Sequence, residues 1–247
     1  VRGVAEIFGI TLEENFKRPF FSKSIQEFWR RWNITLGTWL KEYIFYSVAF
    51  SKWCLNITTK LNIKLKKHKH LAKTLSALCP LIFVWFANGL WHGASWKYVF
   101  YGMYYFIIMA IGMFLEPVFK KLAEFLKINK NSKKYKLWQI LRTFILVNIG
   151  MLIFRSTNIS TAFAIGKSMF DFSSFGEVLN GKIFSLGLDM GEFIILILSI
   201  AIMLIVDYLQ EKNHHIREEI SEKNVFIRWS IYYIGIFSIV IFGIYGK

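Results

Sequence analysis

Five stretches of this 247-residue chain are apolar and long enough to cross a lipid bilayer. They run near residues 74–92, 98–118, 137–155, 193–209 and 229–246. Because a helix rises about 1.5 Å per residue, about 20 residues cross about 30 Å of hydrocarbon. An apolar content of 55% is also high for a soluble domain. The sequence therefore predicts an all-α, polytopic membrane protein with about five transmembrane helices.

The basic charge lies between the apolar stretches. Formal net charge is +15, from 31 Lys and Arg against 16 Asp and Glu. Connections 56–73 and 119–136 are rich in lysine, and short cytoplasmic loops are enriched in positive residues, so both are predicted to be cytoplasmic. Topology and contact with anionic headgroups account for the charge. We therefore expect membrane lipids as partners and no nucleic acid.

A separate amphipathic segment precedes the first apolar stretch. At about 100° per residue, its apolar side chains fall on one face; they are Ile25, Phe28, Trp29, Trp32, Leu36, Trp39, Leu40 and Tyr43. Ser24 and Glu27 have the capping-box form, in which each side chain accepts a hydrogen bond from the other residue's backbone N–H. The pattern predicts a single helix beginning there, which lies at the membrane surface or lines a groove and does not span.

The hexapeptide at 88–93, Asn-Gly-Leu-Trp-His-Gly, is the strongest candidate for chemistry. Polar side chains at membrane depth are costly and often functional. The ordinary pKa of histidine, about 6.5, suits His92 to proton removal near neutral pH. Gly89 and Gly93 allow a substrate or a neighbouring helix to approach the backbone. The pattern equally allows His92 to belong to an interfacial aromatic belt beside Trp91.

Asn33 lies at the edge of the apolar face of the amphipathic segment, where it could reach a cavity. An amide donates and accepts hydrogen bonds but takes no proton, so it could hold a substrate carbonyl or orient His92. The alternative is a boundary residue bonded to water or headgroups.

The remaining polar residues offer few other sites. The other four histidines are predicted to be solvated; they are His68, His70, His214 and His215. Cys54 and Cys79 lack metal-ligand spacing, so no metal site is expected and both are interpreted as packing residues. The signatures of zincins, P-loops, nucleophile elbows and dinucleotide folds are absent from the sequence.

Two longer motifs resemble the membrane-bound O-acyltransferase family. The first comprises 15–20 (Asn-Phe-Lys-Arg-Pro-Phe) and 27–36 (Glu-Phe-Trp-Arg-Arg-Trp-Asn-Ile-Thr-Leu). The second is 89–93, Gly-Leu-Trp-His-Gly. Within the family the chain is most similar to the bacterial polysaccharide branch, which includes alginate O-acetyltransferases and the D-alanyl transfer proteins of teichoic acid.

This resemblance implies a helical fold around a funnel, with His92 deep inside it as the catalytic base. Asn33, a second catalytic residue by this resemblance, stands where the branch commonly has another histidine. The resemblance also suggests residues that bind substrate: Asn88, Trp91, Trp32, Arg30 and Arg31. The two arginines either pair with phosphates of a donor or lipid, or only anchor their helix.

The resemblance also implies how the chain is organised. Residues 1–247 would be the C-terminal portion of one membrane domain whose N-terminal half is missing. Within them, 1–55 would form amphipathic and re-entrant helices with the first motif, and 74–246 a transmembrane bundle with the catalytic histidine.

The implied activity is O-acylation, in particular O-acetylation, of an extracytoplasmic polysaccharide. No bound cofactor is implied; an acyl thioester, acetyl-CoA or acyl carrier protein, would be the co-substrate. The implied location is the bacterial cytoplasmic (inner) membrane, with a periplasmic or cell-surface partner acyltransferase. The alternatives are D-alanyl transfer to teichoic acid, a channel or transporter with a polar path lined by Asn88 and His92, and a catalytically silent scaffold.

Overall fold

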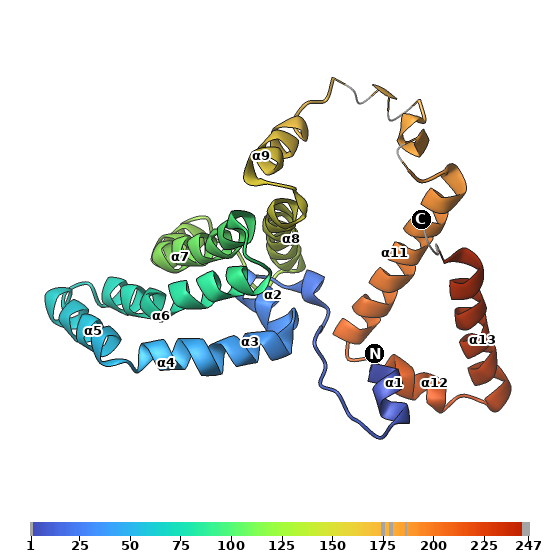
Figure 1. Cartoon of the computed structure of the whole chain (residues 1–247), viewed down its shortest axis with the longest axis horizontal. Coiled ribbons are helices and arrows are strands. Elements are labelled where there is room, and N and C mark those ends of the chain that lie inside the picture. The colour runs from blue at the N-terminus through green and yellow to red at the C-terminus, as the bar shows by residue number, and fades with distance from the viewer. Residues whose placement is uncertain (1, 174–175, 178–179, 186, 244–247) are drawn as a thin grey trace. The chain divides into compact units, whose positions relative to one another are not determined.

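The computed structural model describes residues 2–173, 176–177, 180–185 and 187–243, and these are predominantly helical (Figure 1). The chain divides into two compact units, Val1–Phe170 and Asp171–Lys247. The first contains α1 (Arg2–Ile7), η1 (Pro19–Phe21), α2 (Ile25–Arg31), α3 (Ile34–Leu40), the π-helix η2 (Lys41–Phe45), α4 (Tyr46–Ala49), α5 (Lys52–Lys64), α6 (Lys69–Trp91), α7 (Trp96–Phe125), α8 (Lys133–Arg155) and α9 (Ile159–Ser168). The second contains η3 (Lys182–Ser185), α11 (Met190–Glu211), α12 (Ile216–Ser221) and α13 (Val225–Phe242).

Five described helices are long and apolar enough to span a membrane: α6, α7, α8, α11 and α13. They coincide with the five predicted stretches, which confirms an all-helical, multi-pass membrane protein. The last predicted stretch extends to 246, and its final residues lie outside the described part. In the second unit, α11 and α13 bury none of their residues. Their apolar side chains are thus free to face lipid.

The lysine-rich connections are shorter than predicted. Much of 56–73 is helical, because α5 continues to Lys64 and α6 begins at Lys69. Likewise, α7 continues to Phe125 and α8 begins at Lys133, so 119–136 is mostly helical too. Lysine is a good helix former, so helices continue past the point where the apolar residues stop. The cytoplasmic placement of both segments remains a prediction.

The amphipathic segment that follows Ser24 is not a single helix, so this prediction was wrong. After α2, Trp32 is extended with φ −113° and ψ 125°. Asn33 then adopts a left-handed backbone with φ 49°, and α3 begins at the next residue. From there α3, η2 and α4 follow one another and pack against α6 (Figure 1). A helical wheel drawn through the whole segment therefore loses its phase at Trp32 and Asn33.

Pairing with an earlier segment causes this break. The Lys17 N–H donates to the Arg31 carbonyl at 2.8 Å, and the Ile34 N–H donates to the Asn15 carbonyl at 3.0 Å. The Asn15 side chain also accepts from the backbone N–H of Thr35 at 2.9 Å and from its hydroxyl at 2.7 Å. Asn15 thus caps the first turn of α3 from outside the helix. Helical periodicity carries no signal for such a distant partner.

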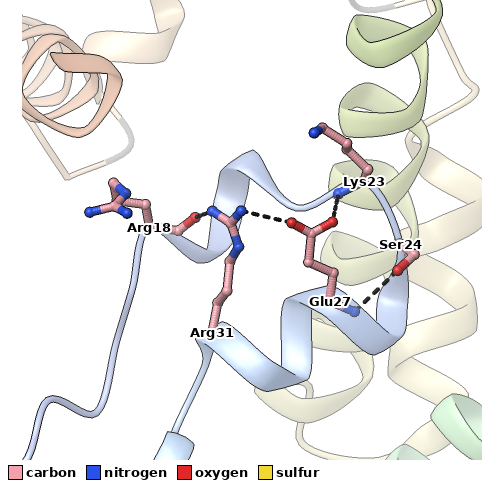
Figure 2. A network of polar contacts seen from close by, with 5 residues as sticks. All are labelled: Arg18, Lys23, Ser24, Glu27 and Arg31. Atoms are coloured by element: carbon pink, nitrogen blue, oxygen red, sulfur yellow. Dashed lines mark hydrogen bonds and ion pairs between the residues drawn. The ribbon is translucent and has the colours of Figure 1, made fainter. Parts of the chain in front are cut away.

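A polar network holds the start of α2 (Figure 2). The Glu27 N–H donates to the Ser24 hydroxyl at 3.1 Å, as the capping box predicts. The return bond differs, because Glu27 accepts from the N–H of Lys23 at 2.9 Å rather than from that of Ser24. The other Glu27 oxygen accepts from Arg31 at 2.7 Å, and Arg31 also donates to the Arg18 carbonyl at 3.4 Å. The network ties α2 to the segment before it.

An aromatic cluster fixes α2 against α6, α7 and α8. The Trp29 ring packs edge-on against Trp85, at a centroid distance of 5.0 Å, and against Tyr105, at 4.9 Å. Phe28 and Tyr105 are fully buried. The Tyr105 hydroxyl donates to the Val147 carbonyl in α8 at 3.4 Å. The first motif is thereby anchored on three membrane helices.

Two glycines allow α6 and α7 to lie in close contact. A Cβ atom at Gly89 would lie 2.5 Å from the Tyr98 carbonyl oxygen, and one at Gly102 would collide with the Trp85 carbonyl. Small residues at such positions let helix backbones approach. Gly93, with φ 143°, lies in the turn between the two helices. Gly89 was predicted to allow close approach of either a substrate or a neighbouring helix, and in the structure the helix α7 lies against it.

Candidate functional site

A cavity of about 610 Å³ lies between α2, α3 and the first turn of η2 on one side and α6 and α7 on the other. Apolar side chains form much of its lining: Trp29, Ile34, Leu36, Leu40, Leu81, Val84, Trp85 and Met109. Its polar lining comprises Gln26, Arg30, Asn33, Thr38, Lys41 and Asn88, and Trp32 and Gly37 complete it. A largely apolar pocket with a few polar groups is typical of a small-molecule site.

Four of the predicted site residues meet in this cavity: Arg30, Trp32, Asn33 and Asn88. Asn33 lines it for a different reason than the one predicted from helical period. Its left-handed backbone lies at the break between α2 and α3, where the chain changes direction. Asparagine tolerates this conformation better than most residues. Asn33 makes no side-chain capping bond to α3, because Asn15 supplies that cap.

Asn88 brings an unsatisfied amide oxygen to the cavity wall. The residue is 4% exposed, and its Oδ1 has no hydrogen-bond partner among the described residues. The indole N–H groups of Trp29 and Trp85, on the same lining, are also without acceptors in the described part. Buried polar groups are usually paired. Two donors and an acceptor thus lie buried in residues that line this side of the cavity, without hydrogen-bond partners among the described residues.

His92 follows Asn88 by four residues, so the two share one face of α6 at its carboxyl end. Its imidazole is partly buried among aromatic rings, with centroid distances of 4.7 Å to Trp91, 4.9 Å to Phe154 and 5.6 Å to Tyr101. It makes no hydrogen bond to another described residue, which leaves its ring nitrogens available to a substrate. His92 does not itself line the cavity.

The electrostatic setting of His92 favours the neutral ring. His92 lies one residue beyond the last residue of the span α6. Burial disfavours the charged imidazolium and lowers the pKa of His92 below its ordinary value. Near neutral pH the imidazole is consequently available as a base.

The remaining predicted residues, Trp91 and Arg31, lie outside the cavity lining. Trp91 is 57% exposed and packs against the His92 ring. The Arg31 side chain is only 20% exposed and pairs with Glu27. The two adjacent arginines thus have different surroundings: Arg30 lines the cavity, and Arg31 belongs to the network that holds α2.

This difference predicts that replacing each arginine by glutamine affects a different property of the protein. Arg30→Gln removes a cavity cation and is expected to raise KM for an anionic donor about tenfold, with little change in stability. Arg31→Gln breaks a partly buried ion pair and is expected to lower the free energy of unfolding by about 1 kcal/mol without raising KM. Steady-state kinetics and thermal unfolding of both variants in detergent measure this. A KM effect confined to Arg31→Gln would contradict the assignment.

The cavity lining also includes three residues that the sequence pattern did not predict as site residues: Lys41, Thr38 and Gln26. On a single continuous helix, Lys41 would lie on the polar face, opposite the apolar side chains. Instead, the break at Asn33 sets a new helical phase, and Lys41 lies where α3 passes into the π-helix η2. Wider π turns often occur at functional sites.

The fold and its five apolar helices define a multi-pass, all-helical membrane protein with a cavity beside a histidine. Comparison with known proteins specifies the class further. Residues 3–59, which include Asn33, match the model of the membrane-bound O-acyltransferase family. This chain is related to the bacterial branch of that family, which confirms the resemblance based on the two motifs.

Three relatives illustrate this branch. A probable alginate O-acetylase AlgI of Azotobacter vinelandii is 29% identical over 170 residues, covering 69% of this chain and 28% of that protein. A teichoic acid D-alanyltransferase of Bacillus subtilis is 31% identical over 156 residues, covering 62% and 34% respectively. A peptidoglycan O-acetyltransferase of Helicobacter pylori is 28% identical over 167 residues, covering 68% and 27%. The chain thus spans about a third of the length of the curated relatives it matches.

Proposed function

We propose that the protein containing this chain is a membrane-bound O-acyltransferase that transfers an acyl group, in particular acetyl, to hydroxyls of an extracytoplasmic polysaccharide. One observation carries the proposal: Asn33 from the first motif and Asn88 line one cavity, and His92 of the second motif lies one helical turn beyond Asn88. The alginate, peptidoglycan and teichoic acid enzymes among the relatives support this reaction class over a channel or a silent scaffold.

In the proposed mechanism, His92 acts on the acceptor. A neutral ring nitrogen removes the proton of a sugar hydroxyl as its oxygen attacks the carbonyl carbon of an acyl thioester. The thiolate then leaves and takes the proton from the imidazolium, so the ester and a free thiol are formed. The aromatic rings around His92 limit its movement and reduce its contact with water.

The two asparagines would position the acyl group. The Asn33 amide N–H can donate to the thioester carbonyl, whose oxygen gains negative charge as the hydroxyl attacks. The Asn88 amide oxygen can accept from an N–H or O–H group of a ligand. Arg30 and Lys41 would meet the negative charge of a donor such as acetyl-CoA or an acyl carrier protein.

The proposed direction of transfer is from the cytoplasm to the cell surface of a bacterium. The lysine-rich segments 56–73 and 119–136 would face the cytoplasm, where the thioester is made. The product side would face the polysaccharide acceptor and a periplasmic or cell-surface partner acyltransferase. Fusing a reporter enzyme after Lys130 tests this topology: activity of a cytoplasm-specific reporter supports it, and activity of a periplasm-specific reporter contradicts it.

The acyl group is tested by mass spectrometry of surface glycans before and after mild alkaline hydrolysis. The proposal predicts release of acetate that depends on the intact gene. The runner-up is D-alanyl transfer, favoured by the 31% identity to the Bacillus subtilis D-alanyltransferase. Release of D-alanine in place of acetate would establish that alternative within the same reaction class. Loss of neither group in the deletion strain would contradict acyl transfer.

Two substitutions separate the chemistry of Asn33 from its backbone role. Glycine accepts φ 49° without strain, whereas alanine there costs about 1 kcal/mol. If the amide stabilises the reacting carbonyl, both Asn33→Gly and Asn33→Ala should lower kcat about 100-fold. Asn33→Gly should do so with the wild-type unfolding temperature. Full activity of Asn33→Gly would show that only the turn matters.

A further inference from the structure

Two thiols meet at the contact between α5 and α6. The Cys54 thiol donates to Cys79 Sγ at 3.3 Å. Cys54 lies in the first turn of α5 and is 2% exposed, whereas Cys79 lies midway along α6 and is partly exposed. Both are free thiols in this structure. The acyl-transfer mechanism uses neither of them.

We infer that Cys54 and Cys79 form a reversible disulfide that links the two walls of the cavity. A disulfide requires sulfurs about 2.05 Å apart and side chains already directed toward each other. The 3.3 Å approach already brings the two sulfurs together, and rotation about the side-chain bonds can shorten the distance further. The proposal replaces the interpretation of these cysteines as packing residues and does not depend on the proposed activity.

The position of the pair gives the bond a structural consequence. Cys79 lies two residues before Leu81 and five before Val84, and both of these α6 residues line the cavity. Cys54 begins the helix that follows α4, so it terminates the arm formed by α3, η2 and α4. Both η2 and α4 pack against α6 (Figure 1). A disulfide would thus tie the far end of one cavity wall to the other.

The oxidant must act within an apolar setting. Cys79 lies in a membrane span, and a lipid-soluble quinone is a two-electron acceptor that can reach it. Each thiol loses its hydrogen as the S–S bond forms, and the quinone takes up the two electrons and two protons to become a quinol. A dithiol reductant reverses the step by exchange. The partly exposed Cys79 offers the point of attack, with buried Cys54 closing the bond.

The test uses the full-length protein in lipid nanodiscs treated with decylubiquinone, followed by denaturation, alkylation and peptide mapping without reduction. We expect a linked pair of peptides containing Cys54 and Cys79, lacking two hydrogens and lost on treatment with dithiothreitol. Both residues should lose alkylation together. If both remain fully alkylated while decylubiquinone oxidises a control dithiol membrane protein in the same nanodiscs, the inference is wrong.

Two single variants provide the control. Cys54→Ser and Cys79→Ser should each leave the remaining cysteine alkylated after oxidation. Their elution on gel filtration must match that of the wild type, which separates a missing partner from a misfolded chain. If Cys79 forms its main disulfide with another cysteine in the presence of Cys54, the proposed pairing is likewise overturned.

Discussion

Replacing His92 by alanine is expected to lower the rate of acyl transfer about 100- to 10,000-fold, because a positioned general base contributes about that much. The loss should appear in kcat with thioester and glycan both present. The variant should keep its fold, since the His92 imidazole makes no hydrogen bond to another described residue and the backbone N–H that caps α6 is retained in alanine. The measurement is release of free thiol from the acyl donor by purified protein.

A second histidine gives a matched control. His70 also lies on α6, at its amino end, where it contacts the exposed Glu116 at 3.6 Å. His70→Ala should retain wild-type activity. Equal losses in both variants would point to a general effect of histidine removal and contradict the assignment of His92.

The same base predicts the pH dependence of the reaction. The neutral form of His92 is required, so kcat/KM should fall as pH decreases through its pKa. Because burial lowers that pKa, the acid limb should lie below about 6.5. His92→Ala should lose this limb along with most of the rate. If the residual activity of His92→Ala shows the same acid limb, that limb reports the titration of another group and the prediction is contradicted.

The second large effect concerns the contact between α6 and α7. In Gly102→Ala the new methyl group would meet the Trp85 carbonyl, and backbone atoms cannot move aside as a flexible side chain can. Overpacking of this kind costs about 1–3 kcal/mol or more. Because Trp85 lines the cavity, activity should fall together with stability. The temperature at which half the protein in detergent loses its monodisperse peak should drop by several degrees.

Gly112→Ala in the same helix is the control. A Cβ atom there would have no neighbour within 4 Å, so the change adds helix propensity without a clash. Its unfolding temperature should equal or exceed that of the wild type. If Gly102→Ala is as stable as Gly112→Ala, the close packing of α6 on α7 is not a main source of stability.

The sequence predicts the membrane helices well because an apolar run of about 20 residues fits few structures other than a membrane-spanning helix. It predicts their ends poorly, since lysines that favour water also favour helices. The helix ending at Lys64 and the one beginning at Lys69 illustrate this. Hydropathy marks the part of a helix that lies in hydrocarbon, whereas backbone hydrogen bonds determine where the helix ends.

The candidate site was predicted in part. Asn33, Asn88 and His92 stand out as polar residues in apolar surroundings, and two of them line the cavity. The direction of the chain after Arg31 depends on the break between α2 and α3, where the Lys17 N–H donates to the Arg31 carbonyl and the Asn15 carbonyl accepts from the Ile34 N–H. Pairing between segments so far apart leaves no periodic trace in the sequence. The same break changes the helical phase of α3 and η2, and Lys41 therefore lies on the cavity lining.

The central claim is that this protein acylates a surface glycan through His92. The most direct test measures ester-linked acetate on isolated surface polysaccharide from cells that express the full-length wild-type or His92→Ala protein at equal membrane abundance. The account predicts acetate with the wild type and its loss with His92→Ala. Equal acetate with both proteins would place His92 in the aromatic belt and contradict the mechanism.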